Sequence, residues 1–293
     1  MAGQVEMVFF DVKYGNSTYI KSPNGKHIVI DLGKGSLRNK NEDFSPLLHL
    51  QSKCNVSQLD YVIITHPHKD HIADIMNFVE LVPKVLCNPF DLTKEEIIND
   101  KISNSDMPFY ERYLAINEYY GLKWDEYKRS IIPANFGDLK IDNIHLKYCP
   151  TPNINNHSLI TVFEYATIKV IITGDNETAC LKELIKKPPF VEIVKNADIL
   201  LAPYHGREAG FCKEFVKIVN PRITVISDSR YREKTSKREW YAENSRGWTV
   251  LDKNENCTCP AKTLSTYYHG IITITFGWND ANKPFLHISR SLR

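Results

Sequence analysis

The chain has 293 residues, of which 42% are hydrophobic and 25% are charged, and its formal net charge is +2. This hydrophobic content is ordinary for a globular protein with a core, and the small net charge neither requires nor excludes a nucleic-acid partner. The N-terminus lacks a basic segment followed by an apolar one, and no apolar run approaches membrane-spanning length. We therefore expect no signal peptide and no membrane contact.

The cysteines point to a reducing compartment. Their number is odd, seven, and Cys87, Cys149 and Cys180 stand among apolar residues. Both features fit the cytosol better than a disulfide framework, so we expect a cytoplasmic protein. Cys257 and Cys259 form the one close pair. A single Cys-x-Cys pair is a weak metal signal, and we expect a loop there.

Apolar, β-branched runs predict strands in the first part of the chain. The predicted strands are 5–12, 17–21, 27–31 and 61–64. A short helix is expected over 47–52, and an amphipathic segment at 72–79 predicts the start of another.

Residues 91–129 differ from the rest because they are rich in charged and aromatic side chains. Thr93 can cap a helix, with Glu96 at its third position. Two helices fit, over about 93–101 and 108–129. We expect their tyrosines to pack on the core. The alternative is a cap over an active site.

Strands and helices alternate after residue 139. The predicted strands are 139–148, 158–165, 168–173, 197–203, 223–227, 270–277 and 285–289. The predicted helices are 176–187, which ends at Pro188 and Pro189, 211–219 and 236–245. Strands cluster toward both ends with helices between them. This pattern predicts an α/β (α+β) fold in which two sheets pack together with helices outside, in one domain.

The loop after strand 61–64 is the most informative stretch. Its six residues contain His66, His68, Asp70 and His71, although the chain has only ten histidines. The first two histidines lie two residues apart and can face the same way, and the other two side chains can hold a neighbouring position. Imidazole and carboxylate are ligands that zinc prefers. The loop therefore predicts a metal site, and the alternative is a histidine-rich surface loop.

Three later segments can complete such a site. Asp175 and His205 each follow a buried strand, and His157 stands just before another. A carboxylate at such a strand end can bridge two metals. Each residue alone is more often a capping or loop residue. Strand ends on one edge of a sandwich share a rim where loops build sites, so their common placement favours one shared site.

Two further features concern support and substrate. Asp31, at the end of a neighbouring strand, can brace the histidine loop, and a turn-forming aspartate is the alternative. A strongly basic segment with a tyrosine within it suits phosphate contacts and base stacking, and a solvated loop is the alternative. The candidate substrate-binding residues of this segment are Arg230, Arg232, Lys234, Lys237 and Arg238.

The His-x-His-x-Asp-His pattern at 66–71 resembles the signature of the metallo-β-lactamase fold superfamily. Within it, the chain resembles the hydrolase domain of ComEC-type competence proteins. The matching stretches lie within 9–17, 30–33, 155–158, 203–206 and 236–272. The resemblance implies a four-layer αββα sandwich over residues 1–293, with a helical insertion at about 91–130.

The chain departs from the ComEC-type pattern in several places. Residues 13–16 replace a Gly-Gln-Gly-Asp turn, so that any role of its aspartate is lost or reduced to the amide of Asn16. Tyr204 replaces the first histidine of a Pro-His-His-Gly stretch, and His68 stands where that branch often carries an acidic residue. No membrane channel is present, so DNA transport is not implied.

The resemblance also implies two divalent metal ions, zinc or manganese. The first ion would be held by His66, His68 and His157, the second by Asp70, His71 and His205, with Asp175 as the bridge. The catalytic residues would be Asp70, His71 and Asp175. Two cations that share a water lower its pKa toward neutrality and give hydroxide as the nucleophile, and they clamp the oxygen that gains charge.

The leading prediction is a metal-dependent phosphodiesterase or nuclease that cleaves DNA or another nucleotide substrate. One alternative is a hydrolase of a non-phosphate small molecule such as a lactam, lactone or thioester. The other is a metal-stabilised accessory module without enzymatic activity.

Overall fold

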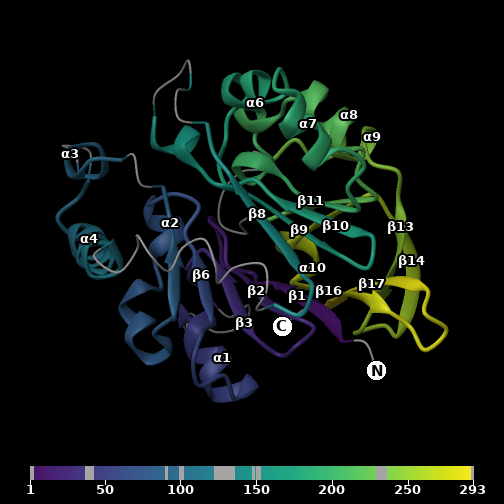
Figure 1. The fold of residues 1–293 in the computed structure, drawn as a ribbon, viewed down its shortest axis with the longest axis horizontal. Helices are drawn as coiled ribbons and strands as arrows, with labels where there is room; N and C mark the ends of the chain where they lie inside the picture. Colours follow the sequence, from purple (N-terminus) through teal and green to yellow (C-terminus); the bar gives the residue numbers. More distant parts are fainter. Residues whose placement is uncertain are drawn as a thin grey trace.

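The structure is a computed structural model, and it describes residues 3–36, 43–89, 92–98, 102–121, 136–146, 149, 153–228 and 236–291. Two sheets stack face to face at its centre, and helices cover the outer face of each sheet (Figure 1). The layers follow the order helix, sheet, sheet, helix. The predicted αββα sandwich is confirmed.

The first sheet has nine strands in the order β14-β13-β17-β16-β1-β2-β3-β6-β7. The strands are β1 Gln4–Phe9, β2 Thr18–Lys21, β3 His27–Ile30, β6 Tyr61–Ile63, β7 Val85–Cys87, β13 Trp248–Asp252, β14 Cys257–Ala261, β16 Ile271–Trp278 and β17 Pro284–Ser291. Strands β3, β6 and β7 run parallel. The residues that follow β3 and β6 therefore meet at one edge of the sheet.

The second sheet has six strands in the order β15-β12-β11-β10-β9-β8. They are β8 Lys140–Ile144, β9 Ile160–Tyr165, β10 Ile168–Ile172, β11 Ile199–Leu201, β12 Ile223–Ile226 and β15 Thr263–Ser265. Strands β10, β11, β12 and β15 run parallel, so their carboxyl ends share one edge. A separate small pair joins β4 Gly35–Ser36 to β5 Asp43–Phe44.

Apolar side chains fill the space between the sheets. Val5, Met7 and Phe9 alternate along β1 and are fully buried there, opposite Phe163 and Val170 of the second sheet. This period of two is what a strand with one face on the core requires. Two further buried clusters lie between each sheet and its own helices.

The helices divide between the two outer layers. Those on the first sheet are α1 Pro46–Cys54, α2 Lys69–Ile72, η1 Ile75–Leu81, α3 Lys94–Ile97 and α4 Met107–Gly121. Those on the second are α6 Thr178–Leu184, α7 Pro188–Val194, α8 Lys213–Val219 and α9 Arg238–Glu243. Short helices η2 Ile154–His157, η3 Pro203–Gly206, η4 Glu208–Gly210 and α10 Thr266–His269 lie in the connections. Within the described segments, no helix has both the length and the apolar character that crossing a membrane needs.

The aromatic-rich region packs as predicted. Tyr110, Tyr113 and Tyr120 of α4 are buried in the cluster against the first sheet. The predicted cap of α3 is also present, because Thr93 Oγ1 accepts a bond from the Glu96 amide at 3.2 Å and Glu96 Oε2 accepts one from the Thr93 amide at 2.7 Å. The predicted second helix is described only as far as Gly121, and its remainder lies outside the described residues.

Two local predictions are wrong. Residues 257–259 form part of strand β14, which pairs antiparallel with β13 at the sheet edge, and not a loop. Most of the side chains of β14 are exposed, so the strand shows no apolar alternation. Pro188 does not merely end a helix but begins α7, where the first position needs no backbone N–H.

Candidate metal centre

The predicted metal ligands gather where the edges of the two sheets meet. His66, Asp70 and His71 come from the segment after β6 of the first sheet. Asp175 follows β10, and His205 lies in η3 after β11 of the second sheet. A hydrogen bond of 3.0 Å from the Leu159 amide to the Thr65 carbonyl joins the two sheets at this point. The parallel strand ends thus bring together residues far apart in sequence.

Four of these side chains form one tight group. His205 Nε2 lies 3.1 Å from Asp175 Oδ2 and 3.5 Å from Asp70 Oδ2. His71 Nε2 lies 3.3 Å from Asp175 Oδ1 and 3.4 Å from His205 Nε2. One potential ligand atom from each of the four lies within 4.8 Å of the others. Ligands held about 2.0–2.2 Å from a shared ion have a similar spacing.

Two more histidines adjoin this group. His66 Nε2 is 3.9 Å from Asp175 Oδ2 and 3.0 Å from His68 Nδ1, and the centroid of its ring lies 4.2 Å from that of His71. Asp175 therefore lies within 4 Å of histidines from both predicted ligand sets. His157 ends η2 directly before Ser158, whose hydroxyl oxygen lies 3.2 Å from His66 Nδ1. The structure thus brings six of the seven predicted ligands into contact with one another. The seventh, His157, is next in sequence to Ser158, which contacts His66.

The electrostatics of the group fit a divalent cation. Burial holds the pKa of His66 well below its usual value, and burial also lowers that of His68. Burial opposes charging of His71 and His205, but carboxylates led by Asp175 outweigh it. They raise the pKa of His71 well above its usual value and that of His205 to about 9. The carboxylates therefore favour a positive charge at this position, and the neutral imidazoles offer lone pairs. Carboxylate and imidazole together form a donor set that zinc or manganese prefers.

Asp31 braces the histidine loop. It is fully buried, and its carboxylate accepts bonds from the Thr65 amide at 2.7 Å, from His71 Nδ1 at 2.8 Å and from the Thr65 hydroxyl. Such a carboxylate fixes the tautomer and orientation of a ligating imidazole. Asp31 also takes a left-handed backbone conformation, φ 58°. These contacts with Thr65 and His71 are the ones that the predicted brace would make.

We expect Asp31→Ala to weaken metal binding about 10–100-fold and to cost about 3–5 kcal/mol of unfolding free energy, because buried donors lose their acceptor. Metal titration and urea unfolding measure the two effects. Asp60→Ala is the matched control, since Asp60 accepts bonds from the His27 amide and Lys84 Nζ at the opposite end of β6. It should lower stability and leave metal affinity unchanged. Equal metal affinity in both variants would refute the brace.

Sequence reasoning missed two polar residues that support the site. Asn16 Nδ2 donates to Asp31 Oδ2 at 3.2 Å, so the amide at the altered turn supplies a donor where an aspartate would repel Asp31. Ser158 Oγ accepts a bond from the Asp175 amide at 2.9 Å and also contacts His66. In sequence, Ser158 was marked only by its place beside His157 and by the matching stretch 155–158, and neither gave it a role in the site.

Two glycines allow the loops to close on one another. Gly15 has φ +96°, and a Cβ there would lie 1.9 Å from the Asp70 carbonyl oxygen. Gly174 has φ +54°, and a Cβ there would lie 2.7 Å from Ser158 Cβ. These close approaches admit only glycine. His205 and its neighbour Tyr204 also have positive φ, 54° and 50°, a strained conformation that is typical of functional sites.

The predicted basic segment is only partly described. Arg230, Arg232 and Lys234 lie outside the described residues. Lys237 Nζ is paired with Glu208 at 3.1 Å. Arg238 Nε donates to Thr263 Oγ1 at 3.0 Å. The last two side chains are therefore engaged within the protein.

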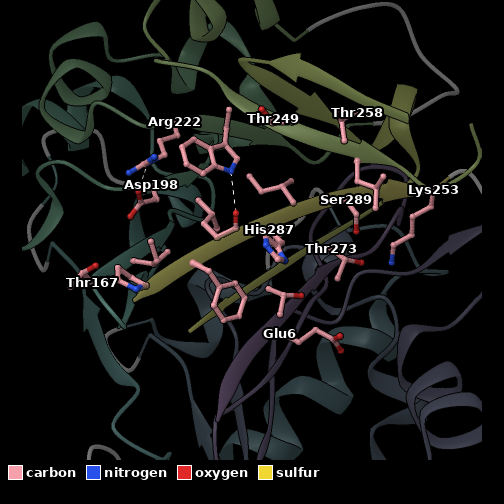
Figure 2. Close-up of a pocket in the computed structure, with 18 residues that line it drawn as sticks. Glu6, Thr167, Asp198, Arg222, Thr249, Lys253, Thr258, Thr273, His287 and Ser289 are labelled. Atoms are coloured by element: carbon pink, nitrogen blue, oxygen red, sulfur yellow. Dashed lines mark hydrogen bonds and ion pairs between the residues drawn. The ribbon is translucent and has the colours of Figure 1, made fainter. Parts of the chain in front are cut away.

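Figure 2 shows a hollow elsewhere in the structure, whose volume is about 860 Å³. Its lining includes Thr167 and Asp198, which precede β10 and β11, the strands whose carboxyl ends lead to Asp175 and His205. The hollow therefore opens at the opposite edge of the second sheet. None of the predicted ligands lines it.

The family model of the metallo-beta-lactamase superfamily matches residues 10–227, a span that contains every predicted ligand. The chain belongs to the metallo-β-lactamase superfamily. ComE operon protein 3 of Bacillus subtilis (strain 168) is 25% identical over 237 residues, which make up 77% of this chain and 28% of that protein. The chain thus spans just over a quarter of this relative's length. The predicted superfamily and its ComEC-type branch are confirmed, and the chain is a metal-dependent hydrolase of this superfamily.

Solved structures that match this chain do so at low sequence identity and with TM-scores below 0.5. The metallo-beta-lactamase fold protein YhfI from Bacillus subtilis is 15% identical, with a TM-score of 0.48, and the match covers 89% of this chain and 95% of that one. A long form RNase Z from yeast is 14% identical, with a TM-score of 0.40, and the match covers 80% of this chain and 38% of that one.

Proposed function

We propose that this hydrolase is a phosphodiesterase that uses two divalent metal ions to cleave DNA or another nucleotide substrate. The arrangement of donors around Asp175 carries the proposal. This carboxylate is buried and lies within 4 Å of His66, which belongs to one predicted ligand set, and of His71 and His205, which belong to the other. A carboxylate in that position suits a bridge between two ions.

Each ion would have its own set of ligands. The first would be held by His66, His68 and His157, and the second by Asp70, His71 and His205. When bound, such a pair of zinc or manganese ions lowers the pKa of a water and stabilises charge on a phosphoryl oxygen. The Asp70 side chain is 36% exposed, whereas that of His71 is 1% exposed. Asp70 is thus the ligand that can reach solvent, and it would orient the attacking water.

The phosphate part of the proposal is supported by the basic segment. Its described flanks are fixed beside the centre. Ser227 Oγ donates to the carbonyl of Gly15 at 2.6 Å, and Gly15 packs on Asp70. On the other flank, Ser236 Oγ donates to Asp228 Oδ2 at 2.7 Å. Cationic side chains in a segment with these flanks would suit contacts with the phosphates of a bound substrate.

We expect single alanine substitutions in the basic segment to weaken nucleotide binding without changing metal content. The substituted residues are Arg230, Arg232, Lys234, Lys237 and Arg238. Each lost phosphate contact should flatten the dependence of log K on log salt by roughly one unit. Lys237 and Arg238 already have partners and should show the smaller effects. Titration of a labelled oligonucleotide at several salt concentrations measures this, with Lys253→Ala at the remote hollow as the control.

The substrate class is tested by incubating the metal-loaded protein with single-stranded DNA, double-stranded DNA, a cyclic dinucleotide and a neutral chromogenic lactam. The proposal expects cleavage of at least one phosphodiester and none of the lactam. Turnover of the lactam, without salt-dependent binding to any nucleotide, would contradict it and favour the small-molecule alternative. Binding without any turnover would favour the accessory module.

Two broader expectations accompany the proposal. A cytosolic location is supported by the cysteines, all seven of which are free thiols. The single domain over residues 1–293 with an insertion at about 91–130 stays a prediction.

A further inference from the structure

Arg207 has an unusual environment next to the candidate metal centre. It lies two residues after His205, and its side chain is half-buried. Its guanidinium carbon lies 5.4 Å from the centroid of the Tyr14 ring and 5.2 Å from that of the Tyr204 ring. Among the residues that the structure describes, no carboxylate lies within ion-pair distance of this guanidinium, and its N–H groups donate no hydrogen bond to the protein.

Two other half-buried arginines are paired with carboxylates. Arg222 Nε donates to Asp198 at 2.7 Å, and an Arg290 terminal nitrogen lies 2.8 Å from Asp252. Arg246, which is exposed, donates to two backbone carbonyls. These three cations have partners within the protein. Contacts with two rings hold the Arg207 guanidinium in place but leave its N–H groups available to a ligand. The planar arrangement of these N–H groups matches the oxygens of a phosphate.

The two tyrosines tie Arg207 to both ligand loops. Tyr14 precedes Gly15, whose backbone packs against the carbonyl of Asp70. Tyr204 precedes His205, and the amide of Arg207 donates to the Tyr204 carbonyl at 2.9 Å. Arg207 thus lies between the turn at Tyr14 and Gly15, which contacts Asp70, and the η3 segment that carries His205.

We propose that Arg207 binds a non-bridging phosphate oxygen of the substrate, with Tyr14 and Tyr204 holding its guanidinium in place. The inference rests on the proposed function and deepens it, because it names the residue that would distinguish an anionic phosphodiester from a neutral ester. No sequence pattern indicated this residue, since Tyr14 and Arg207 are nearly 200 residues apart.

The test compares Arg207→Gln with Arg207→Lys, two variants that keep a long side chain and differ in charge. A thymidine dinucleotide with a phosphorothioate linkage serves as a slowly cleaved probe, titrated into metal-loaded protein by calorimetry at several salt concentrations. Arg207→Gln should raise the Kd at least about tenfold and flatten the salt slope by roughly one unit. Arg207→Lys should keep the slope and most of the affinity. Tyr14→Leu, which removes one ring, should give an intermediate loss.

A second measurement uses two substrates with the same leaving group. Arg207→Gln should slow cleavage of bis(p-nitrophenyl) phosphate by raising KM, and it should leave turnover of neutral p-nitrophenyl acetate unchanged. Metal content should equal that of the wild type. Wild-type affinity and salt slope in Arg207→Gln would overturn the inference, and so would equal loss of metal in both Arg207 variants, which would reveal a purely structural role. A wild-type protein that binds no dinucleotide and cleaves no phosphodiester would instead contradict the proposed function.

Discussion

Asp175→Asn is expected to remove at least one of the two metal ions and to slow hydrolysis by about 10³-fold or more, a barrier increase of about 4 kcal/mol. The carboxylate lies within 4 Å of His66, His71 and His205. Buried histidines hold its pKa well below the usual range, despite burial, which alone would raise it. An amide of the same shape keeps the packing and loses the charge that holds cations there.

Elemental analysis of protein purified without chelator measures the metal content. The wild type should carry more than one equivalent of zinc, manganese or iron, and Asp175→Asn should carry fewer. Asp198→Asn is the matched control, because Asp198 is also buried in the second sheet but directly precedes β11, and it pairs with Arg222 at the opposite edge. It should lower stability only. A metal-replete, active Asp175→Asn protein would show that the bridge is wrong.

Asp70→Ala is expected to abolish measurable hydrolysis while the protein stays folded. The loss removes a ligand and the solvent-facing carboxylate that would orient the attacking water, and a fall of about 10³-fold or more in kcat is expected. Asp70 lies in α2, within the predicted metal-binding segment, and belongs to none of the buried hydrophobic clusters. Its thermal unfolding midpoint in the metal-free state should therefore stay within a few degrees of the wild type.

Asp74→Ala is the control with the opposite outcome. Asp74 lies four residues on, is buried, and accepts bonds from the Ser45 hydroxyl at 2.7 Å, the Leu47 amide at 3.0 Å and the Asn77 side chain at 2.8 Å. Its loss should cost about 2–4 kcal/mol of unfolding free energy, because buried donors lose their acceptor, and should leave the activity of the folded fraction intact. Substantial turnover in metal-replete Asp70→Ala would contradict the assigned role.

Much of the site could be predicted because its ligands follow strand ends, and strand ends are visible in the local sequence. Buried β-branched runs that stop at Thr65, Thr173 and Ala202 mark strand ends, and parallel strands must bring such ends to one edge. The ligands follow those ends directly, so His66, Asp175 and His205 could be placed together before any contact was known.

Contacts between distant loops could not be predicted in this way. The bond from Asn16 to Asp31 and the stacking of Tyr14 on Arg207 depend on how turns from different sheets meet. The strand β14 was missed for a different reason. Its side chains are mostly exposed at the sheet edge, so its sequence lacks the alternation of apolar and polar residues that marks a strand. Pro260 is tolerated there because a strand at a sheet edge can lack one backbone N–H donor.

We propose that one cluster of side chains holds two divalent ions. Anomalous diffraction at the zinc and manganese absorption edges, from crystals of metal-loaded protein, tests it most directly. We predict two peaks on either side of Asp175, one among His66, His68 and His157 and the other among Asp70, His71 and His205. A single peak, no peak, or peaks away from these side chains would contradict the claim.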